Sequence, residues 1–376
     1  MKKALLQACA LCVGATGVHA AGLDRSGQGI NLIFEEGSAL QARLGYAIPD
    51  ISGEQNGVES GNVGENFFAP GLGYKRALTD KLDFALIYDQ PFGADVEYPS
   101  NFPLSQNPLA PFGGRTDVLR AEADVDAITA VLRYKVGNGF SALGGVRGQR
   151  IDANVAVPAV LGYEVDFDNT TDFGYLVGVA WERPEIAARV SLVYNSKITH
   201  DIDTTESFNA LGPTGVVVQT VDSTTRVETP QSINLDFQTG VAPKTLVFGS
   251  IRWVDWPQAD VAPQAFTALP PNSDPLVSFA DETLTYTLGV GYQFSDEFSG
   301  AISAGYERDT GSLVSNLGPT NGFWSLGVGG TYSLEKTQIS GGIRYTDIGD
   351  ATTTTGGEFS GNSAWSVGLQ LTYALD

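Results

Sequence analysis

The residues that could support covalent or metal chemistry are few in this sequence, and they do not form a recognisable set. There are 2 histidines and 2 cysteines. Cys9, Cys12 and His19 lie close to the N-terminus, which leaves His200 alone in the rest of the chain. No serine, aspartate or second histidine stands at a spacing from His200 that indicates a catalytic triad or a zinc site. The glycine-rich string at 327–330 lies inside a strand pattern and does not indicate a phosphate loop. The sequence therefore predicts no enzyme, no cofactor and no metal site.

The charge balance narrows the range of partners. The chain has 43 Asp and Glu against 22 Lys and Arg, a formal net charge of −21. A nucleic-acid partner is excluded, because such binding needs an excess of basic residues. Acidic pairs such as Asp166 with Asp168, and Asp201 with Asp203, could bridge divalent cations to lipopolysaccharide. Solvated loop charge is the alternative explanation for them.

One predicted strand, at 245–256, departs from the usual alternation of apolar and polar residues. Leu246 and Phe248 occupy one parity, and Val247 and Ile251 occupy the other. Some apolar side chains must therefore point into any barrel that this strand joins. A water-filled pore does not need them, whereas a conduit for an apolar ligand does. We predict Leu246 and Phe248 as ligand-binding residues, with packing against an internal plug as the alternative.

The most distinctive positioning element is the stretch at 82–98. Every second residue is apolar except Gln90, which indicates an extended strand with one apolar face. It is about three times as long as an ordinary strand, as expected if it crosses a bilayer obliquely and continues beyond it. Pro91, Phe92 and Gly93 interrupt it, because proline lacks an N–H and glycine bends a strand. We predict a break in the wall at these residues.

The N-terminus predicts export. Residues 1–20 resemble a secretory signal peptide, with a basic start at Lys2 and Lys3, an apolar run, and a small-x-small site at 18–20. Both cysteines fall within it, so the mature chain has none and no disulfide framework is predicted. No later run of about 18 apolar residues indicates a membrane helix. An exported, cysteine-free chain with long alternating strands is typical of the Gram-negative outer membrane.

The alternating segments predict an all-β fold, a 14-stranded antiparallel transmembrane β-barrel. Short and long connections alternate along the chain, as in outer-membrane barrels, where short turns face the periplasm. A closed barrel also leaves no unpaired sheet edge in lipid. The predicted strands are 40–48, 67–77, 82–98, 118–136, 140–155, 173–183, 186–201, 225–241, 245–256, 283–294, 298–308, 323–334, 338–348 and 364–375.

Residues 21–37 precede the barrel, which we place at 38–376. Gly27 and Gly29 make this segment flexible, and Ile30 and Phe34 bound a short apolar patch. We predict a hatch, or plug, inside or under the barrel; a disordered periplasmic tail is the alternative. Outer-membrane lipid, lipopolysaccharide and the barrel-assembly machinery are the expected partners besides a hydrophobic ligand.

Several stretches, in their order and spacing, resemble the FadL family of outer-membrane long-chain fatty acid and hydrocarbon transporters. They lie at 71–86, 91–98, 173–181, 230–235 and 253–256. The resemblance implies a fourteen-strand barrel with an N-terminal hatch and an inward kink in the third strand. The kink would form a lateral gate at Pro91, Phe92 and Gly93, through which ligand leaves into the membrane.

The resemblance also implies a basic site for the fatty-acid head group. Its fifth-strand member falls near Arg147 to Arg150, while the other position falls near 279–281, where no cation stands. The hatch is shorter than is usual in the family and lacks its Asn-Pro-Ala motif. We expect passive uptake of long-chain fatty acids or similar molecules with Arg147 or Arg150 near the carboxylate. The alternatives are an aromatic or alkane hydrocarbon channel of the same build, and a general porin or structural protein.

Overall fold

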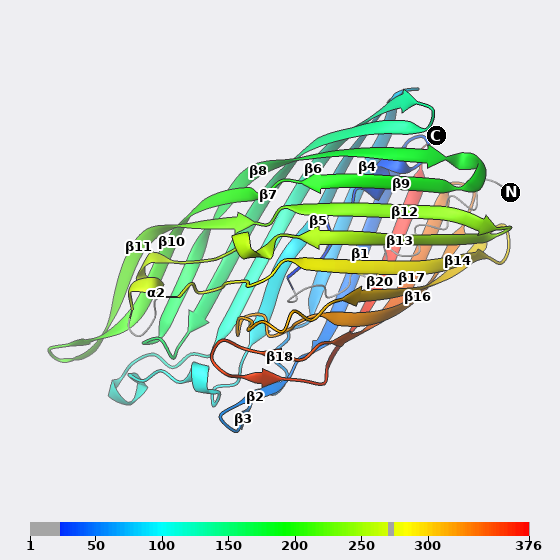
Figure 1. Cartoon of the computed structure of the whole chain (residues 1–376). Helices are drawn as coiled ribbons and strands as arrows, with labels where there is room; N and C mark the ends of the chain where they lie inside the picture. The colour runs from blue at the N-terminus through cyan, green and yellow to red at the C-terminus, as the bar shows by residue number, and fades with distance from the viewer. Residues whose placement is uncertain (1–22, 270–273, 376) are drawn as a thin grey trace.

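A computed structural model describes residues 23–269 and 274–375. The predicted signal peptide and its cleavage site lie outside the described residues. The chain forms the predicted closed antiparallel barrel of 14 wall strands, which run obliquely around the cylinder (Figure 1). Within the described ranges, no helix is long and apolar enough to cross a bilayer.

The wall strands follow one another in chain order around the barrel. Closure is made by β1 and β20, which pair from Ala39↔Ala374 to Asp50↔Ser363. The strands are β1 (Ala39–Asp50), β4 (Phe67–Thr79), β5 (Leu82–Glu97), β6 (Arg120–Gly137), β7 (Phe140–Val157), β8 (Tyr163–Arg183), β9 (Ala188–Asn195) continued by β10 (Ile198–Gly212), β11 (Gly215–Thr229) continued by β12 (Ser232–Ala242), β13 (Thr245–Val254), β14 (Thr283–Gln293), β15 (Phe298–Glu307), β16 (Phe323–Ser333), β17 (Thr337–Ile348) and β20 (Asn362–Ala374).

The smaller elements lie in the hatch and in the connections. Four short strands form a separate sheet in the order β18-β19-β2-β3. These elements are η3 (Asn31–Phe34), β2 (Gly53–Gln55), β3 (Val58–Glu59), η4 (Pro103–Ser105), η5 (Ala110–Phe112), η6 (Pro184–Ile186), η7 (Trp256–Gln258), α2 (Gln264–Ala268), β18 (Ala351–Thr352) and β19 (Glu358–Phe359).

The two faces of the wall differ as the period of two predicts. In β20, Trp365 and Leu369 are exposed on the outer face, while Ser366 and Gln370 are buried on the inner face. An outward band of apolar residues has no core to bury it, so it fits a lipid environment. Aromatic rings stand near both ends of the band, as at membrane interfaces. They include Phe173, Tyr175, Tyr306, Trp324 and Trp365 at one end, and Phe140, Phe294, Phe298, Tyr332 and Tyr373 at the other.

Two predicted strands are not continuous. The prediction at 186–201 ran across a break at 196–197, between β9 and β10, and the prediction at 225–241 ran across a break at 230–231, between β11 and β12. Pro230 lacks the N–H that a continuous ladder needs. The sequence also predicted a long loop at 158–171, between the strands predicted at 140–155 and 173–183. This was wrong in part, because β8 already begins at Tyr163. These corrections all concern one side of the barrel, where β10 and β11 form a hairpin that bends away from β9 and β12 (Figure 1).

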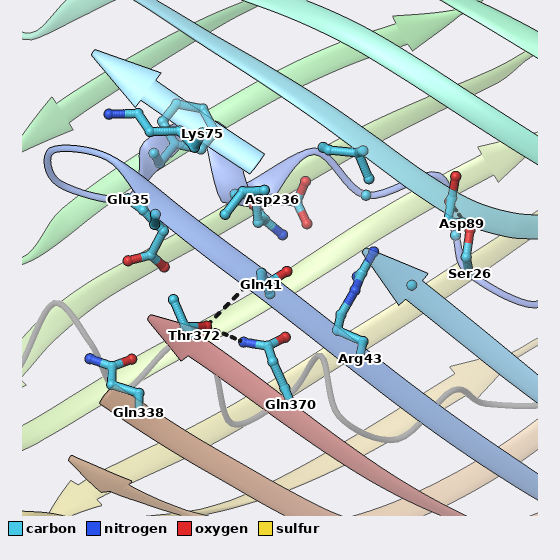
Figure 2. A pocket seen from close by; sticks show the side chains of 18 of the residues that line it. Ser26, Glu35, Gln41, Arg43, Lys75, Asp89, Asp236, Gln338, Gln370 and Thr372 are labelled. Atoms are coloured by element: carbon cyan, nitrogen blue, oxygen red, sulfur yellow. Dashed lines mark hydrogen bonds between the residues drawn. The ribbon is translucent and has the colours of Figure 1, made fainter. Parts of the chain in front are cut away.

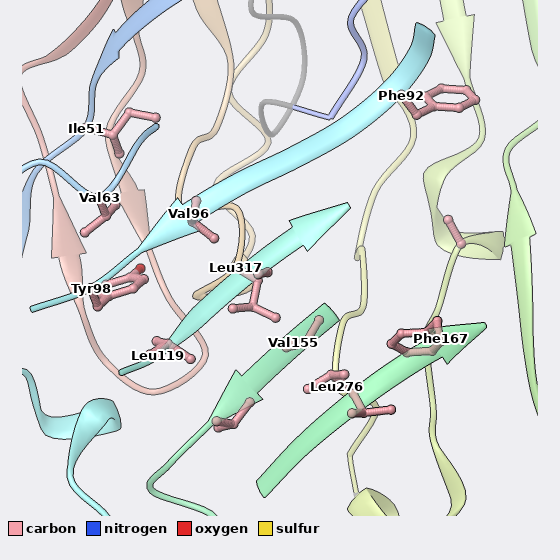
Figure 3. Close-up of a cluster of buried hydrophobic side chains, with 14 of the residues drawn as sticks. Ile51, Val63, Phe92, Val96, Tyr98, Leu119, Val155, Phe167, Leu276 and Leu317 are labelled. Carbon is pink, nitrogen blue, oxygen red and sulfur yellow. The ribbon is translucent and has the colours of Figure 1, made fainter. Parts of the chain in front are cut away.

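The long connections fold over one end of the barrel, which we call the long-loop end. The opposite, short-turn end carries the turns at 138–139 and 243–244. Apolar side chains from the loops and from the loop-side ends of the wall strands fill the long-loop half (Figure 3). They include Ile51, Val96, Tyr98, Leu119, Val155, Phe167, Leu276 and Leu317. This half of the barrel is therefore apolar inside.

Residues 23–37 lie inside the barrel. Ile30, Leu32, Ile33 and Phe34 are buried against the inner faces of the wall, where they meet apolar residues such as Ile87. Both Arg133 and Arg189 stand over the Phe34 ring, with Cζ at 4.9 and 4.6 Å from its centroid. The segment thus runs through the lumen toward the short-turn end, where it joins β1.

Candidate functional site

The wall opens at the predicted break in β5. β4 and β5 pair from Thr79↔Leu82 only as far as Leu72↔Tyr88. Beyond that point, residues 67–71 of β4 pair with β1 alone. Residues 92–97 of β5 stay paired with β6, after a register shift between Asp89 and Phe92. We call the space between residues 67–71 of β4 and 89–97 of β5 the kink gap.

Other parts of the chain take the place of β4 along the kink gap. Asp24 bridges to Phe92 and Gly64 bridges to Val96, both antiparallel. The Arg25 N–H donates to the Pro91 carbonyl at 2.9 Å, and the Gly93 N–H donates to the Leu23 carbonyl at 3.0 Å. The hatch therefore satisfies the backbone of the kink that β4 leaves unpaired, and it does so without being part of the barrel ladder.

Arg25 fills the kink gap with its side chain. Its guanidinium pairs with Asp95 at 2.8 Å and with Asp124 at 3.2 Å, and its Cζ lies 4.3 Å from the centroid of Phe67 on β4. A Cβ built on Gly93 would stand 2.2 Å from Arg25 Cζ. Gly93 is thus the residue whose lack of a side chain lets Arg25 lie across the gap.

The same segment is anchored to the far wall. Asp24 and Arg252 form a buried ion pair, with Oδ2 and Nε 2.6 Å apart. The Ser26 hydroxyl donates to the Asp89 carboxylate of β5. The Ser232 hydroxyl donates to Gln28 Oε1 at 2.7 Å. The hatch therefore spans the lumen from β5 to β12 and β13, held by polar contacts that can be broken and remade.

A cavity of about 890 Å³ lies on the short-turn side of the hatch and reaches the short-turn end (Figure 2). Here 'above' means toward the long-loop end and 'below' means toward the short-turn end. Charged side chains line much of it, and Lys75 and Lys135 pair there with Asp83 at 3.1 and 3.0 Å. The charged lining residues include Glu35, Arg43, Lys75, Asp83, Asp89, Arg133, Arg189, Asp236, Arg252 and Arg344. The two halves of the lumen thus differ: the long-loop half is apolar, whereas the cavity toward the short-turn end has a mixed lining, in which apolar residues such as Leu32 and Phe248 stand among the charged ones.

Arg147 and Arg150 lie on opposite faces of β7. Arg147 points inward and is 4 % exposed, and its guanidinium donates to Thr129 at 2.9 Å and to Asn195 at 3.1 Å. No carboxylate of the described residues lies within ion-pair distance of it. Arg150 points outward and donates to Asn169 at 3.0 Å. The expectation that Arg150 could lie near a ligand carboxylate in the lumen is wrong, because side chains three residues apart on a strand face opposite sides.

Leu246 and Phe248 point inward from β13 and are buried. Phe248 borders the charged cavity. Phe92 of the kink packs edge-on against Trp256, with centroids 5.7 Å apart, and Trp256 meets Phe279 at 5.3 Å. Aromatic side chains therefore stand directly behind the kink gap, at the border of the apolar half.

The hatch glycines have distinct settings. Gly27 has a φ of +64°, and its carbonyl accepts from Asn234 at 2.9 Å. Gly29 has open space around it, with nothing within 4 Å of a Cβ built there. The polar residues Asp24 and Arg25, with Arg252 on β13, were missed by sequence reasoning. The signal available was an adjacent acid and base at the start of a segment whose other charged residues are Glu35 and Glu36 at its end.

His200 is fully buried. It lies on the long-loop side of the aromatic residues at that end of the apolar band, such as Phe173 and Tyr175, and so beyond the membrane-spanning part of the wall. Its Nδ1 lies 3.1 Å from Asp172 and its Nε2 lies 3.5 Å from Gln149. Burial lowers the pKa of His200, and Asp172 offsets part of that shift. The ring faces an amide where a hydrolase would place its serine. The described residues contain no cluster suited to a metal ion.

A closed barrel with a lumenal hatch, a kinked wall strand and an apolar interior at its long-loop end is typical of an outer-membrane channel for hydrophobic molecules. The chain belongs to the family of outer membrane protein transport proteins (OMPP1/FadL/TodX), whose model matches residues 40–374. Its members are transport channels of the outer membrane for hydrophobic small molecules. Because short turns face the periplasm in outer-membrane barrels, the short-turn end is the periplasmic end. The resemblance seen in the sequence is confirmed. No curated protein matches the sequence significantly.

Solved structures share the fold at low sequence identity. A FadL homologue of Pseudomonas aeruginosa has a TM-score of 0.72 at 14 % identity, with 92 % of each chain covered. The Pseudomonas putida toluene transporter TodX gives 0.66 at 15 %, covering 91 % of each chain. The Ralstonia pickettii toluene transporter TbuX gives 0.64 at 13 %, covering 91 % of this chain and 90 % of its own. At such identity these likenesses concern the fold.

Proposed function

We propose that the protein carries long-chain fatty acids, or similar molecules with one carboxylate, into the outer membrane through the kink gap. The observation that supports this most is the exchange of backbone partners along β5. The strand takes the hatch in place of β4 between Pro91 and Gly93. A gap closed by a removable segment can open sideways while the rest of the wall stays paired.

The two halves of the lumen support a lateral path over a vertical one. Each methylene moved out of an apolar site costs about 0.8 kcal/mol. A long acyl chain would lose part of that on passing the charged side chains of the cavity, among them Asp83, Arg133 and Arg252. The kink gap instead opens beside Phe68 and Leu72, which are exposed on the outer face of β4.

Arg147 supports a carboxylate ligand. A buried guanidinium without a hydrogen-bonded carboxylate is costly. The hydrogen-bond partners of Arg147 in the described chain are the neutral Thr129 and Asn195, and the Asp89 carboxylate attracts it only from beyond ion-pair distance. A ligand carboxylate would add a charge-assisted hydrogen bond there. The acyl chain would lie in the apolar upper half.

Aromatic hydrocarbon transport is the second candidate, and the Phe92–Trp256–Phe279 group favours it. Edge-to-face stacking suits an aromatic ligand and needs no cation. Two of the similar structures are described as toluene transporters. Arg147 separates the two candidates.

The test compares Arg147→Ala with the matched control Arg150→Ala, from the outer face of the same strand. Binding and uptake of oleate and toluene are measured on each folded variant. Loss of a charge-assisted hydrogen bond, worth about 1.5–3 kcal/mol, predicts at least about tenfold weaker oleate binding for Arg147→Ala. Toluene and the control should be unaffected. Unchanged oleate binding in Arg147→Ala would overturn the carboxylate proposal, and toluene uptake without oleate uptake would favour the second candidate.

A further inference from the structure

A second interruption lies in the wall between β8 and the strand made of β9 and β10. β8 pairs with β9 from Leu176↔Asn195 to Arg183↔Ala188. It pairs with β10 only from Thr204↔Phe167 to Ser207↔Glu164. Between these ladders, residues 168–174 and 198–203 have no strand pairing across this line in the described chain. We call this stretch the β8–β10 seam.

One backbone hydrogen bond at the base of the seam, from the Ser196 N–H to the Tyr175 carbonyl at 2.9 Å, and several side chains close it. The Ser196 hydroxyl accepts from the Tyr175 N–H at 2.9 Å. Ile198 packs onto Gly174, where an added Cβ would stand 2.6 Å from Ile198 Cγ1. His200 Nδ1 then meets Asp172 Oδ2 at 3.1 Å. Unlike the kink gap, the seam has no third segment bridged to its backbone among residues 23–269 and 274–375.

The hairpin that forms one lip of the seam is hinged at its base. The breaks at 196–197 and 230–231 lie side by side, since Asn195 pairs with Ser232 below them and Ile198 pairs with Thr229 above them. β10 and β11 pair continuously from there to their tip. The hairpin can therefore bend at these two breaks while the β8–β9 ladder stays intact, and the short β8–β10 ladder at Thr204–Ser207 is the strand pairing that such a movement has to release.

The surroundings of the seam suit an amphipathic molecule. At its base, Tyr175 and Tyr194 lie with ring centroids 6.1 Å apart on the outer face, at the level of the outer interface. Behind it stand Phe167 and Ile202 of the apolar half. At its lower end, Arg147 pairs in register with Gly174.

We infer that the β8–β10 seam is a second lateral passage, which admits single-chain carboxylates from the outer leaflet to Arg147 and the apolar half of the lumen. The head group of such a molecule rests at the interface, level with the Tyr175 and Tyr194 rings, so its carboxylate reaches the seam before its chain does. The kink gap then serves as the exit. This inference rests on the proposed function.

The mature chain is predicted to lack cysteine, so a disulfide can lock the seam. In Gly174→Cys/Ile198→Cys, one sulfur would take the place of Ile198 Cγ1, beside the new Cβ. The control pair Ala180→Cys/Ser191→Cys joins registered residues of the β8–β9 ladder. Oxidation should slow oleate uptake severalfold in the seam pair alone, and reductant should restore it. Equal uptake in the oxidised and reduced seam pair would overturn the inference.

A second test opens the seam with a bulky side chain, which we call a wedge, in place of locking the seam with a disulfide. It measures access of a reagent to the seam, so it does not depend on net transport. Gly174→Val would push Ile198 away, and Ile198→Ala in the same chain would relieve it. A single cysteine at Ile202→Cys, behind the seam, is labelled with an acyl-chain maleimide in outer-membrane vesicles. Labelling should be faster with Gly174→Val and slower again in the double variant. Labelling that ignores the wedge would overturn the seam passage, whereas wedge-sensitive labelling without oleate uptake would overturn only the proposed function.

Discussion

Asp24 carries more of the hatch docking than any residue that sequence reasoning selected. Its carboxylate and Arg252 form a buried pair at 2.6 Å. Removing one partner of such a pair costs about 3 kcal/mol or more, because the other charge stays buried. Asp24→Asn should therefore raise the open population of the hatch about a hundredfold.

Hydrogen exchange checks this at the Arg25 amide, which donates to Pro91 in the docked hatch. The control is Asp201→Asn, which removes an exposed pair with Arg226. Exposed pairs contribute little, so the control should leave the Arg25 amide unchanged. Equal protection of this amide in Asp24→Asn and the parent protein would show that the ion pair does not hold the hatch.

His200 makes the pH dependence of stability predictable in sign. Burial lowers its pKa in the folded protein, so the unfolded chain takes up a proton first as the pH falls below about 6.5. The imidazole therefore stabilises the fold above that pH and loses its contribution on acidification. The unfolding temperature of the parent should fall more between pH 7.5 and 5 than that of His200→Gln. The same fall in both proteins would contradict the assignment.

At the residue scale, the sequence predicted the candidate site only in part. The mixed pattern of β13 predicted that some apolar side chains face the lumen, and the structure shows that Leu246 and Phe248 are among them. The alternation in β7 already favoured an inward Arg147, whereas the resemblance alone brought in Arg150, which the same alternation places on the outer face. The contacts of Asp24 and Arg25 depend on residues more than sixty positions away, which no local pattern reveals.

At the element scale, β5 shows what a local pattern can and cannot specify. Pro91 and Gly93 predicted the break because their backbones are poor ladder partners. The segments that replace β4 there could not be predicted, since each docks through a single bridge, the hatch at Asp24 and the connection before β4 at Gly64. The breaks beside Lys197 and Pro230 were missed because the apolar alternation continues across them.

Gly93 gives an element-scale prediction. A side chain there would overlap the Arg25 guanidinium, so Gly93→Val should expel Arg25. Overpacked sites cost about 1–3 kcal/mol, so hydrogen exchange of the hatch amides should increase about fivefold to 160-fold. Gly29→Val is the matched control, because a side chain has room at that glycine of the same segment. Adding Arg25→Ala to Gly93→Val should remove the overlap. Slow exchange in Gly93→Val would mean that Arg25 does not occupy the gap.

At the scale of the whole molecule, the sequence predicted the barrel because its two faces face different solvents. Lipid requires apolar residues at every second position, and closure requires every strand to be paired. The division of the lumen into an apolar upper half and a charged lower half did not follow from single strands. It arises where loops, hatch and wall meet, as Ile51, Phe92 and Trp256 show.

The account stands on the hatch leaving the kink gap during transport, and a disulfide tests this most directly. Ser26→Cys/Asp89→Cys joins the hatch to β5 at side chains already in contact, and the Ala180→Cys/Ser191→Cys pair is again the control. Oleate uptake is measured in cells before and after reduction. We predict that the oxidised hatch pair takes up almost no oleate and that reductant restores uptake, with no change in the control. Full uptake with the hatch locked to β5 would contradict exit through the kink gap.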